Sequence, residues 1–375
     1  MEGARRDFVG RRWVMERLDE WLNSSGRFFH LVGEPGSGKT ALSRQLVHLA
    51  SATSEDNADF PSIRTGFIDA SHFCSARDRR MVNPITFAES LGSQLAKQSQ
   101  VYTNAMLKAI GAQPNVVKQR VESAENSTVI GVLIEELNAR GPSPEDAFNR
   151  LVREPLEALC RAEPARMIVI LVDALDESLA YRGDVGIVPL LAQADDLPAQ
   201  IRFVLTSRPV PEIERKLAAA SGSVERLTLS AVEWDAHNRD DIAAYIASRF
   251  TSDDAIAPRV AAVDAATSKG AAAEINARAG GNFLYARFLL DAVGNGQWKL
   301  EELATAKTAV PSSEARGMDT LYQLYMQSLE RVIEQGKGDW QTDYAPLMES
   351  LSAAQETLPR ERLRTFAGQK ETAFR

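Results

Sequence analysis

The stretch that most constrains the fold is residues 33–40, which read GEPGSGKT. It follows the apolar run 28–32 and precedes a helical pattern in which Leu42, Leu46 and Leu49 share one face. A glycine-rich loop that joins a strand to a helix is the context in which the pattern G-x-x-x-x-G-K-[ST] binds phosphate. The sequence therefore predicts a phosphate site here, with a solvated glycine turn before a helix as the alternative.

We name residues 33–40 the phosphate loop. Gly33, Gly36 and Gly38 permit backbone angles that a Cβ atom disfavours, so the loop can turn its N–H groups inward around an anion. The dipole of the following helix adds to the attraction. We expect Lys39 to reach the β- and γ-phosphates of a nucleotide and the Thr40 hydroxyl to bind Mg²⁺. The nucleotide-binding residues predicted here are Gly33, Glu34, Pro35, Gly36, Ser37, Gly38, Lys39, Thr40 and Ala41.

An acidic run follows the apolar segment 167–172. Asp173 ends this predicted strand, where a carboxylate can hold Mg²⁺, usually through water. Nucleotide hydrolysis also needs a second acid that orients and activates the attacking water. Glu177 is the first candidate for that role and Asp176 the second. The alternative is an acidic turn that caps the next helix.

Arg208 follows another apolar run, residues 201–206. At the end of a strand, its planar guanidinium can contact the γ-phosphate of a nucleotide and so respond to its presence. The alternative is an arginine that pairs with an aspartate or glutamate at the same edge of the sheet.

The order of the segments predicts a parallel sheet covered by helices on both faces, followed by an all-helical second half. In such sheets ligands bind at the carboxyl ends of the strands, where all three motifs lie. The predicted strands are 28–32, 63–69, 167–172, 201–206 and 224–229. The predicted helices are 8–22, 84–98, 101–110, 127–139, 143–161, 185–194, 238–250, 255–279, 283–293, 318–335, 343–357 and 358–375. We expect loops at 51–59 and 71–83.

Composition excludes several other classes. The net charge of −8 does not indicate nucleic acid or an anionic membrane as a general partner. The two cysteines, Cys74 and Cys160, do not suggest a disulfide framework. The chain has neither a signal-peptide core nor a run of about 20 apolar residues, so we expect a cytoplasmic protein. The scattered histidines do not match zinc spacing, and no G-x-S-x-G element is present.

Together the motifs GEPGSGKT, ILVDALDES and FVLTSRP resemble the NACHT branch of the STAND class of P-loop NTPases. The acidic run carries the most specific resemblance, because a small residue, Ala174, follows Asp173 and displaces the acidic pair to Asp176 and Glu177. Residues 8–11, FVGR, resemble the adenine-side motif of the family. The resemblance therefore adds Val9, Gly10 and Arg11 to the expected nucleotide-binding residues.

The resemblance implies a three-layer α/β core at 1–230 with the phosphate-loop strand central, a helical domain at 231–315 and a partial winged-helix region at 316–375. It implies ATP or ADP with Mg²⁺, and a molecular switch in signalling or defence that hydrolyses ATP slowly. The expected partners are effector and sensor domains or proteins missing from this chain, and further copies of the chain when ATP is bound. The sequence departs from plant-type relatives, since Gly281-Asn-Phe283 replaces their Gly-x-Pro element.

Two other functions remain open from the sequence. One is an ATPase of the AAA type that cycles continuously and remodels a macromolecule. The other is a scaffold in which a bound nucleotide only holds the fold together. The displaced acids and the TSRP element favour the switch.

Overall fold

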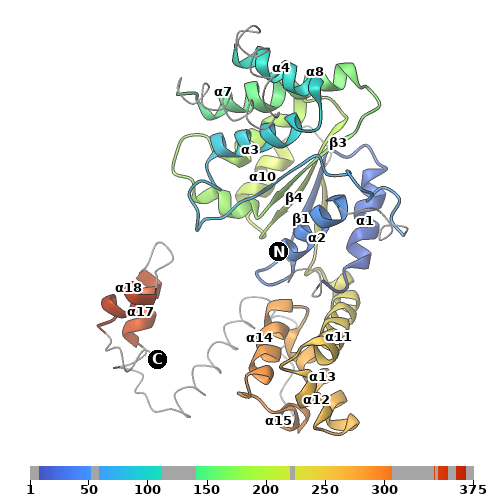
Figure 1. The fold of residues 1–375 in the computed structure, drawn as a ribbon, viewed down its shortest axis with the longest axis vertical. Coiled ribbons are helices and arrows are strands. Elements are labelled where there is room, and N and C mark those ends of the chain that lie inside the picture. Colours follow the sequence, from blue (N-terminus) through green and yellow to red (C-terminus); the bar gives the residue numbers. More distant parts are fainter. Residues whose placement is uncertain are drawn as a thin grey trace, which may run out of the picture. The chain divides into compact units, whose positions relative to one another are not determined.

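A computed structural model of the chain describes residues 8–51, 59–111, 141–219, 224–305, 342, 345–353 and 360–368. The chain divides into two compact units, Met1–Val310 and Pro311–Arg375 (Figure 1). The domain boundaries predicted at 230 and 315 stay predictions.

The first unit begins with an α/β region. Its strands are β1 (Phe28–Val32), β2 (Ala70–Phe73), β3 (Ile168–Asp173), β4 (Ile201–Ser207) and β5 (Val224–Thr228). Its helices are α1 (Arg12–Leu22), α2 (Lys39–Ser51), α3 (Pro84–Ala96), α4 (Gln100–Ile110), α7 (Pro144–Phe148), α8 (Glu154–Ala162), α9 (Ile187–Ala192) and α10 (Pro211–Ala219). Short 3-10 turns lie at Leu175–Ala180, Gln193–Asp196 and Val232–Trp234.

The five strands form one parallel sheet in the order β2-β3-β4-β1-β5. The fold is therefore the α/β fold of a P-loop NTPase, as the sequence predicts. The phosphate-loop strand β1 is interior, but the expectation that it is central is wrong, because β4 holds the middle position. This order places the ends of β3 and β4 side by side and the phosphate loop next to β4.

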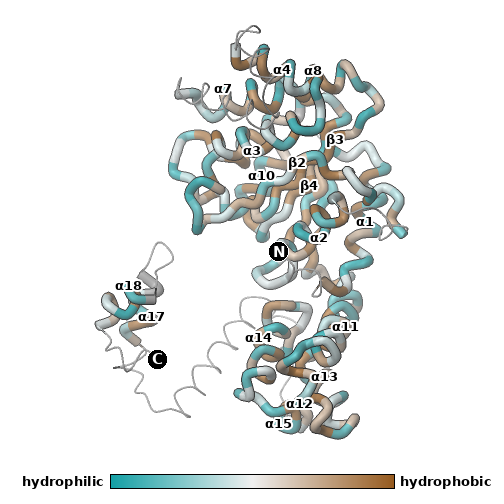
Figure 2. Tube along the Cα trace, viewed as in Figure 1, coloured by the Kyte–Doolittle hydropathy of each residue, from teal (hydrophilic) through white to brown (hydrophobic). Residues whose placement is uncertain are grey.

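Side chains of the strands alternate between two hydrophobic cores, one on each face of the sheet. On β3, Ile168, Ile170 and Val172 pack on the face covered by α3, α4, α8 and α10. Val169 and Leu171 pack on the opposite face, against α1 and α2 (Figure 1). Because both faces are covered, β3 and β4 are buried along their whole length and appear as hydrophobic segments inside the molecule (Figure 2).

The strand predicted at 63–69 is wrong. Residues 61–66 form turns. The second strand is Ala70–Phe73, which begins just before the expected loop at 71–83 and occupies its first three residues. Ile63 and Phe67 are buried, but they pack from turns into the core beside α1 and α2. Their burial explains the misleading pattern, since an apolar run shows burial without showing extended backbone.

The helix predicted at 143–161 is confirmed with one irregularity. Ser143 caps α7 by accepting a hydrogen bond from the Asp146 N–H at 3.2 Å, as expected. A π-helical turn, Asn149–Arg153, then joins α7 to α8. Its carbonyl at Leu151 accepts a hydrogen bond from the buried Tyr102 hydroxyl, so the turn packs directly against α4.

The remaining described part of the first unit contains the helices α11 (Asp235–Ser252), α12 (Ala257–Ala261), α13 (Ala265–Ala279), α14 (Phe283–Gly294) and α15 (Leu300–Thr305). The helix predicted at 255–279 is divided, because Asp264 caps a new helix with a hydrogen bond from the Thr267 N–H. Asn282 caps α14 as predicted, accepting from the Tyr285 N–H at 3.1 Å.

The second unit is described only at α17 (Ala345–Ala353), α18 (Arg360–Phe366) and a few neighbouring residues. These helices fall within the predicted segments 343–357 and 358–375. The helices predicted at 127–139 and 318–335 lie outside the described residues. Among the residues the structure describes, no helix is long and apolar enough to cross a membrane. Both cysteines are buried free thiols.

Candidate functional site

The phosphate loop connects the carboxyl end of β1 to the start of α2. Gly36 and Gly38 have φ angles of 82° and 92°, which glycine adopts at little cost. The reason given for Gly33 is wrong, since its φ is not positive. A Cβ atom at Gly33 would instead lie 2.5 Å from Ser37 Oγ, so any larger residue here would force the Ser37 side chain to shift.

Lys39 lies against the loop that it follows. Its amine donates to the carbonyl oxygens of Gly33 at 2.6 Å and Glu34 at 3.1 Å. Burial lowers the pKa of Lys39, while the nearby carboxylates of Asp176 and Asp173 act to raise it. The ammonium group therefore lies between the loop and the acidic run, where phosphate oxygens of a nucleotide would meet it.

Asp173 ends β3 and is buried, with 1% of its surface exposed. Its Oδ1 atom accepts hydrogen bonds from Ser43 Oγ at 2.7 Å and Thr206 Oγ1 at 2.6 Å. The Thr206 hydroxyl in turn accepts from the Ala174 N–H at 2.9 Å. Two hydroxyl donors thus fix the orientation of the carboxylate that the sequence assigns to Mg²⁺.

Sequence reasoning missed both of these hydroxyl residues, although each left a signal. Ser43 is three residues after Thr40, so both lie near one face of α2. Thr206 precedes Ser207 in β4, and the register that pairs Val172 with Leu205 brings Thr206 beside Asp173. The contact between Thr206 and Asp173 can be inferred only once the pairing of β3 with β4 is known.

The two acidic residues, Asp176 and Glu177, accept hydrogen bonds from different parts of the chain. Ala174 adopts a left-handed conformation with a φ of 54°, and a 3-10 turn begins after it. Within that turn, Glu177 Oε2 accepts from the Ala76 N–H at 2.8 Å. Asp176 instead accepts from the Arg208 N–H at 3.0 Å. The two candidates for the catalytic acid thus face different neighbours.

Arg208 pairs with an acidic residue at the same edge of the sheet, which is the alternative that the sequence leaves open. Its Nε atom lies 3.1 Å from Asp176 Oδ2, so it forms an ion pair with the neighbouring strand end. Its side chain is still 53% exposed and lines the pocket described next. The contact with a γ-phosphate stays a prediction.

A pocket of about 670 Å³ brings most of the predicted residues together. This volume lies within the range of about 300–1,000 Å³ found for small-molecule sites. The predicted residues that line it are Val9, Arg11, Pro35, Gly36, Gly38, Lys39, Thr40, Ala41, Asp176, Glu177 and Arg208. The lining does not include the other predicted residues, which are Gly10, Gly33, Glu34, Ser37 and Asp173. Phe8 adds an apolar side chain next to Val9.

Arg11 is buried, and its side chain donates hydrogen bonds to other residues of the protein. It has a φ of 62° and is 2% exposed. Its guanidinium donates to the Ser37 carbonyl oxygen at 2.6 Å and also to Asn238 Oδ1. Burial lowers the pKa of Arg11 to about 10, and the nearby Asp241 opposes this shift. Residues 8–11 therefore touch both the phosphate loop and helix α11.

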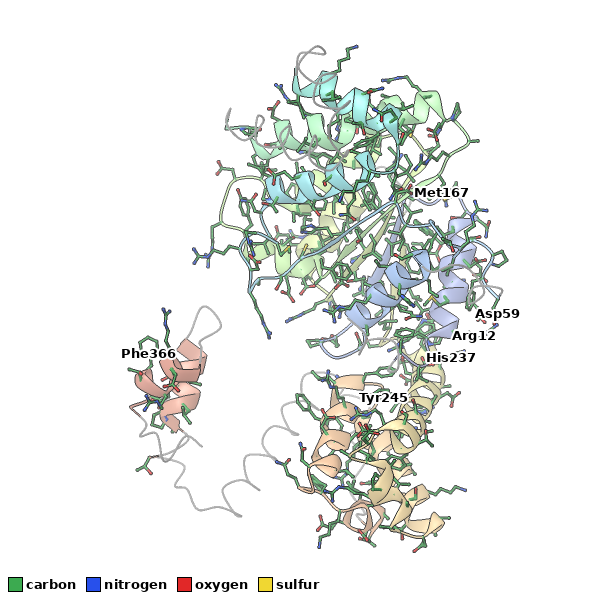
Figure 3. All side chains as sticks on the ribbon, in the orientation of Figure 1. Arg12, Asp59, Met167, His237, Tyr245 and Phe366 are labelled. Atoms are coloured by element: carbon green, nitrogen blue, oxygen red, sulfur yellow. The ribbon has the colours of Figure 1, made fainter. Side chains whose placement is uncertain are left out.

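Helices α11 and α14 supply a wall of the pocket that the sequence did not identify. Its residues are Tyr245, Arg249, Asp253, Phe283, Leu284, Arg287 and Asp291. Tyr245, labelled in Figure 3 on α11, packs against the Phe283 ring with centroids 5.7 Å apart. Arg249 joins the helices, because its guanidinium bonds Asp253 and Asp291 at 2.8 and 2.7 Å. The available signal was the predicted helix at 283–293, which contains four of these lining residues.

The residues present fit a magnesium nucleotide. Glycine-rich backbone and Lys39 suit phosphate oxygens, while the Thr40 hydroxyl and the Asp173 carboxylate are hard oxygen donors of the kind Mg²⁺ prefers. Magnesium at phosphate sites takes only one or two protein carboxylates and fills its shell with water and phosphate. The described residues contain no cluster of three or more His, Cys, Asp or Glu side chains that could hold a metal ion.

Comparison with known proteins adds a family. The family model described as "AAA ATPase domain" matches residues 7–211, which is more than half of the 375 residues. Comparison with curated proteins finds no match. The Walker-type ATPase PABY2304 of Pyrococcus abyssi is similar in structure at 14% identity and a TM-score of 0.45, covering 97% of this chain and 89% of that one. A likeness at that TM-score is too weak to support an argument.

The family model covers the phosphate loop, the acidic run and Arg208, which are the motifs that the fold gathers at one edge of its sheet. The matched region, the parallel sheet and the pocket agree on a P-loop ATPase core. This chain belongs to the AAA ATPase domain family.

Proposed function

We propose that the chain is a nucleotide-dependent switch of the NACHT type within the STAND class. It binds ATP and ADP, hydrolyses ATP slowly with Mg²⁺, and opens and oligomerises on exchange of ADP for ATP, in signalling or defence. The proposed partners are effector and sensor domains or proteins outside this chain, and further copies of it. Neither nucleic acid nor membrane is proposed.

One observation carries the proposal: the pocket has two walls from different parts of the chain. The phosphate loop and the acidic run form one wall, and α11 and α14 form the other. A nucleotide in this pocket contacts both. If ATP and ADP bind two arrangements of these walls with different affinity, exchange shifts the population between the arrangements.

The side chains divide the chemistry of hydrolysis among them. Glu177 accepts a proton from the attacking water as its oxygen bonds to the γ-phosphorus, and the bond from that phosphorus to the bridging oxygen breaks to leave ADP and phosphate. Lys39 neutralises charge on the phosphates. Bound Mg²⁺ would be held by Thr40 and Asp173 and would neutralise further phosphate charge.

Turnover by the purified monomer separates a switch from a motor. We expect roughly 0.01 turnovers per second or fewer, in the range of regulatory GTPases with an arginine in the same chain. Phosphate release from ATP and Mg²⁺ measures it. Turnover near the enzyme median of about 10 per second would exclude the switch.

Glu177→Gln should keep ATP binding and lower hydrolysis by roughly 10²- to 10⁴-fold, because the amide cannot take the proton. Asp176→Asn is the matched variant, since it removes the carboxylate that pairs with Arg208. An inactive Asp176→Asn together with an active Glu177→Gln would reverse the roles of the two acids.

Lys39→Ala should abolish tight ADP binding, because the phosphates lose a direct cation. Titration calorimetry with ADP and Mg²⁺ measures the loss, and Lys97→Ala, which removes an exposed lysine after α3, serves as the control. Equal affinity of the wild type and Lys39→Ala would refute the phosphate-loop assignment.

The second candidate function is a continuously cycling AAA-like ATPase that remodels a macromolecular partner. Membership of the AAA ATPase domain family favours it. Its signature is rapid turnover that rises further with the partner, so the phosphate-release assay also separates this candidate from the switch.

A further inference from the structure

The carbonyl groups of the phosphate loop are held from outside the loop. Three consecutive carbonyl oxygens each accept a hydrogen bond from a distant part of the chain. The pairs are Asn282 Nδ2 to Pro35 at 3.0 Å, the Leu284 N–H to Gly36 at 3.2 Å, and the Arg11 guanidinium to Ser37 at 2.6 Å. Two of the donors stand at the start of α14, and the third stands before α1.

The direction of a carbonyl fixes the direction of the next N–H. A peptide unit is planar and trans, so its C=O and N–H bonds point in opposite directions. Holding the carbonyls of Pro35 and Ser37 outward therefore turns the N–H groups of Gly36 and Gly38 the other way. An anion-binding nest needs that arrangement, and glycine alone has no intrinsic preference for it.

Asn282 is itself held firmly in place. It is 5% exposed, and its Oδ1 atom accepts the capping hydrogen bond from the Tyr285 N–H while Nδ2 reaches the loop. The contact is close, since a Cβ atom at Gly36 would overlap Asn282 Oδ1 and lie 2.6 Å from Leu284 Cβ. Both ends of the Asn282 amide are thus used, one for the helix and one for the loop.

Arg11 is held from α11. Asp241 accepts from the Arg11 N–H at 3.0 Å and from Trp13 Nε1 at 3.0 Å, and its other contact with the guanidinium is an ion pair at 3.7 Å. The guanidinium also lies over the Phe283 ring, 4.9 Å from its centroid. A displacement of α11 or α14 would therefore pull on the phosphate loop directly.

We propose that Asn282 and Arg11 are positioning residues that hold the phosphate loop in its anion-binding conformation, so that α11 and α14 control the affinity for nucleotide phosphates. The inference rests on the proposed function, because it takes a nucleotide as the ligand. Movement of these helices away from the loop frees its carbonyls and lowers the affinity for the β-phosphate. Partners that displace the helices would thereby release ADP.

The decisive variant is Asn282→Asp. Aspartate caps a helix as well as asparagine does, so the bond from the Tyr285 N–H is kept. The donor toward Pro35 is replaced by an oxygen, which repels the carbonyl. We expect ADP affinity to fall by tenfold or more. The melting temperature of the nucleotide-free protein should fall as well, because a buried carboxylate then faces the Pro35 carbonyl without a donor.

AMP separates loop positioning from a general effect on the pocket. AMP lacks the β-phosphate, so its affinity should fall much less than that of ADP in Asn282→Asp. Competition titration of the full chain measures both nucleotides. An equal fall for AMP and ADP would overturn the proposal, because it would place the effect on the nucleoside side.

Two further variants complete the test. Asn83→Asp changes another capping asparagine, at α3, where Oδ1 accepts from the Ile85 N–H at 2.8 Å; it should leave both affinities unchanged. Arg11→Lys keeps the charge beside Asp241 but cannot reach Asn238 and Ser37 together, so it should repeat the selective loss of ADP.

The possible failures are distinguishable. A wild-type chain that binds neither ADP nor ATP refutes the proposed function. A wild type that binds ADP, together with Asn282→Asp and Arg11→Lys variants that bind it equally well, refutes only the positioning role.

Discussion

Single residues at the carboxyl edge of the sheet take partners from elements that are far apart in sequence. Asp173 is held by hydroxyls from α2 and β4, and Asp176 by Arg208 at the end of β4. These contacts give the two carboxylates different partners although the residues lie within one short acidic run. The Asp176–Arg208 pair means that a γ-phosphate would have to compete with Asp176 for the guanidinium.

His30 predicts how stability depends on pH. It is buried on β1, with Nε2 2.8 Å from Ser207 Oγ. Burial, with a contribution from the charge of Arg226, lowers the pKa of His30 to about 4. Below pH 6.5 the unfolded chain binds a proton that the folded chain does not. The contribution of neutral His30 to the free energy of unfolding is therefore complete above pH 6.5 and is lost as the pH falls toward 4.

We expect His30 to cost about 2 kcal/mol of stability at pH 5 relative to pH 7.5. Urea unfolding at both pH values measures the difference. His30→Gln, which can keep a hydrogen bond to Ser207 without titrating, should reduce the loss, and His48→Gln on α2 is the control. Burial also lowers the pKa of His72, so part of the slope remains. Equal slopes in the wild type and His30→Gln would contradict the prediction.

At the level of elements, the sequence identified β1, β3, β4 and β5 correctly. The first three are short, mostly apolar runs that are buried along their whole length, whereas β5 has only one buried side chain, that of Leu227. It failed at β2, an edge strand of four residues in which only two side chains are buried. The apolar residues nearby, Ile63 and Phe67, belong to buried turns. The apolar pattern therefore indicated which residues are buried. The extended backbone of β2 depends on its pairing with β3.

Gly92 on α3 tests how tightly elements pack. A Cβ atom there would lie 2.9 Å from the Leu151 carbonyl oxygen in the π-helical turn. Alanine favours helix over glycine by about 1 kcal/mol, whereas overpacking costs about 1–3 kcal/mol. The obstacle is backbone, so we expect Gly92→Ala to destabilise the chain. Chemical denaturation measures the change, and an increase in stability would show that α3 moves away from the turn easily.

The whole molecule combines two compact units, and the nucleotide site belongs to the first. Among the residues that the structure describes, those that line the pocket lie between Phe8 and Asp291, whereas the second unit begins at Pro311. Within the first unit, the stacked rings of Trp13 and Trp234, with centroids 4.6 Å apart, join the α/β region to the start of α11. His237, labelled in Figure 3, packs against both rings.

Removal of residues 311–375 should therefore leave ADP affinity unchanged. Titration calorimetry of the full and shortened chains compares the two constants, and the melting shift gives a second measure, since a ligand at 1,000 times its Kd stabilises by about 4 kcal/mol. A tenfold loss of affinity, about 1.4 kcal/mol, would show that the second unit contributes to the nucleotide site.

The sequence by itself determined the phosphate loop, most of the helices that the structure describes and most of the strands, because backbone freedom, capping and hydrophobic period are local properties. Only the tertiary structure decided that Arg208 pairs with Asp176, that Ser43 and Thr206 hold Asp173, and that Arg11 and Asn282 reach the phosphate loop. These contacts depend on strand order and on distances of about 3 Å between segments up to 247 positions apart. No local pattern along the chain encodes such distances, because they follow from how the elements pack together.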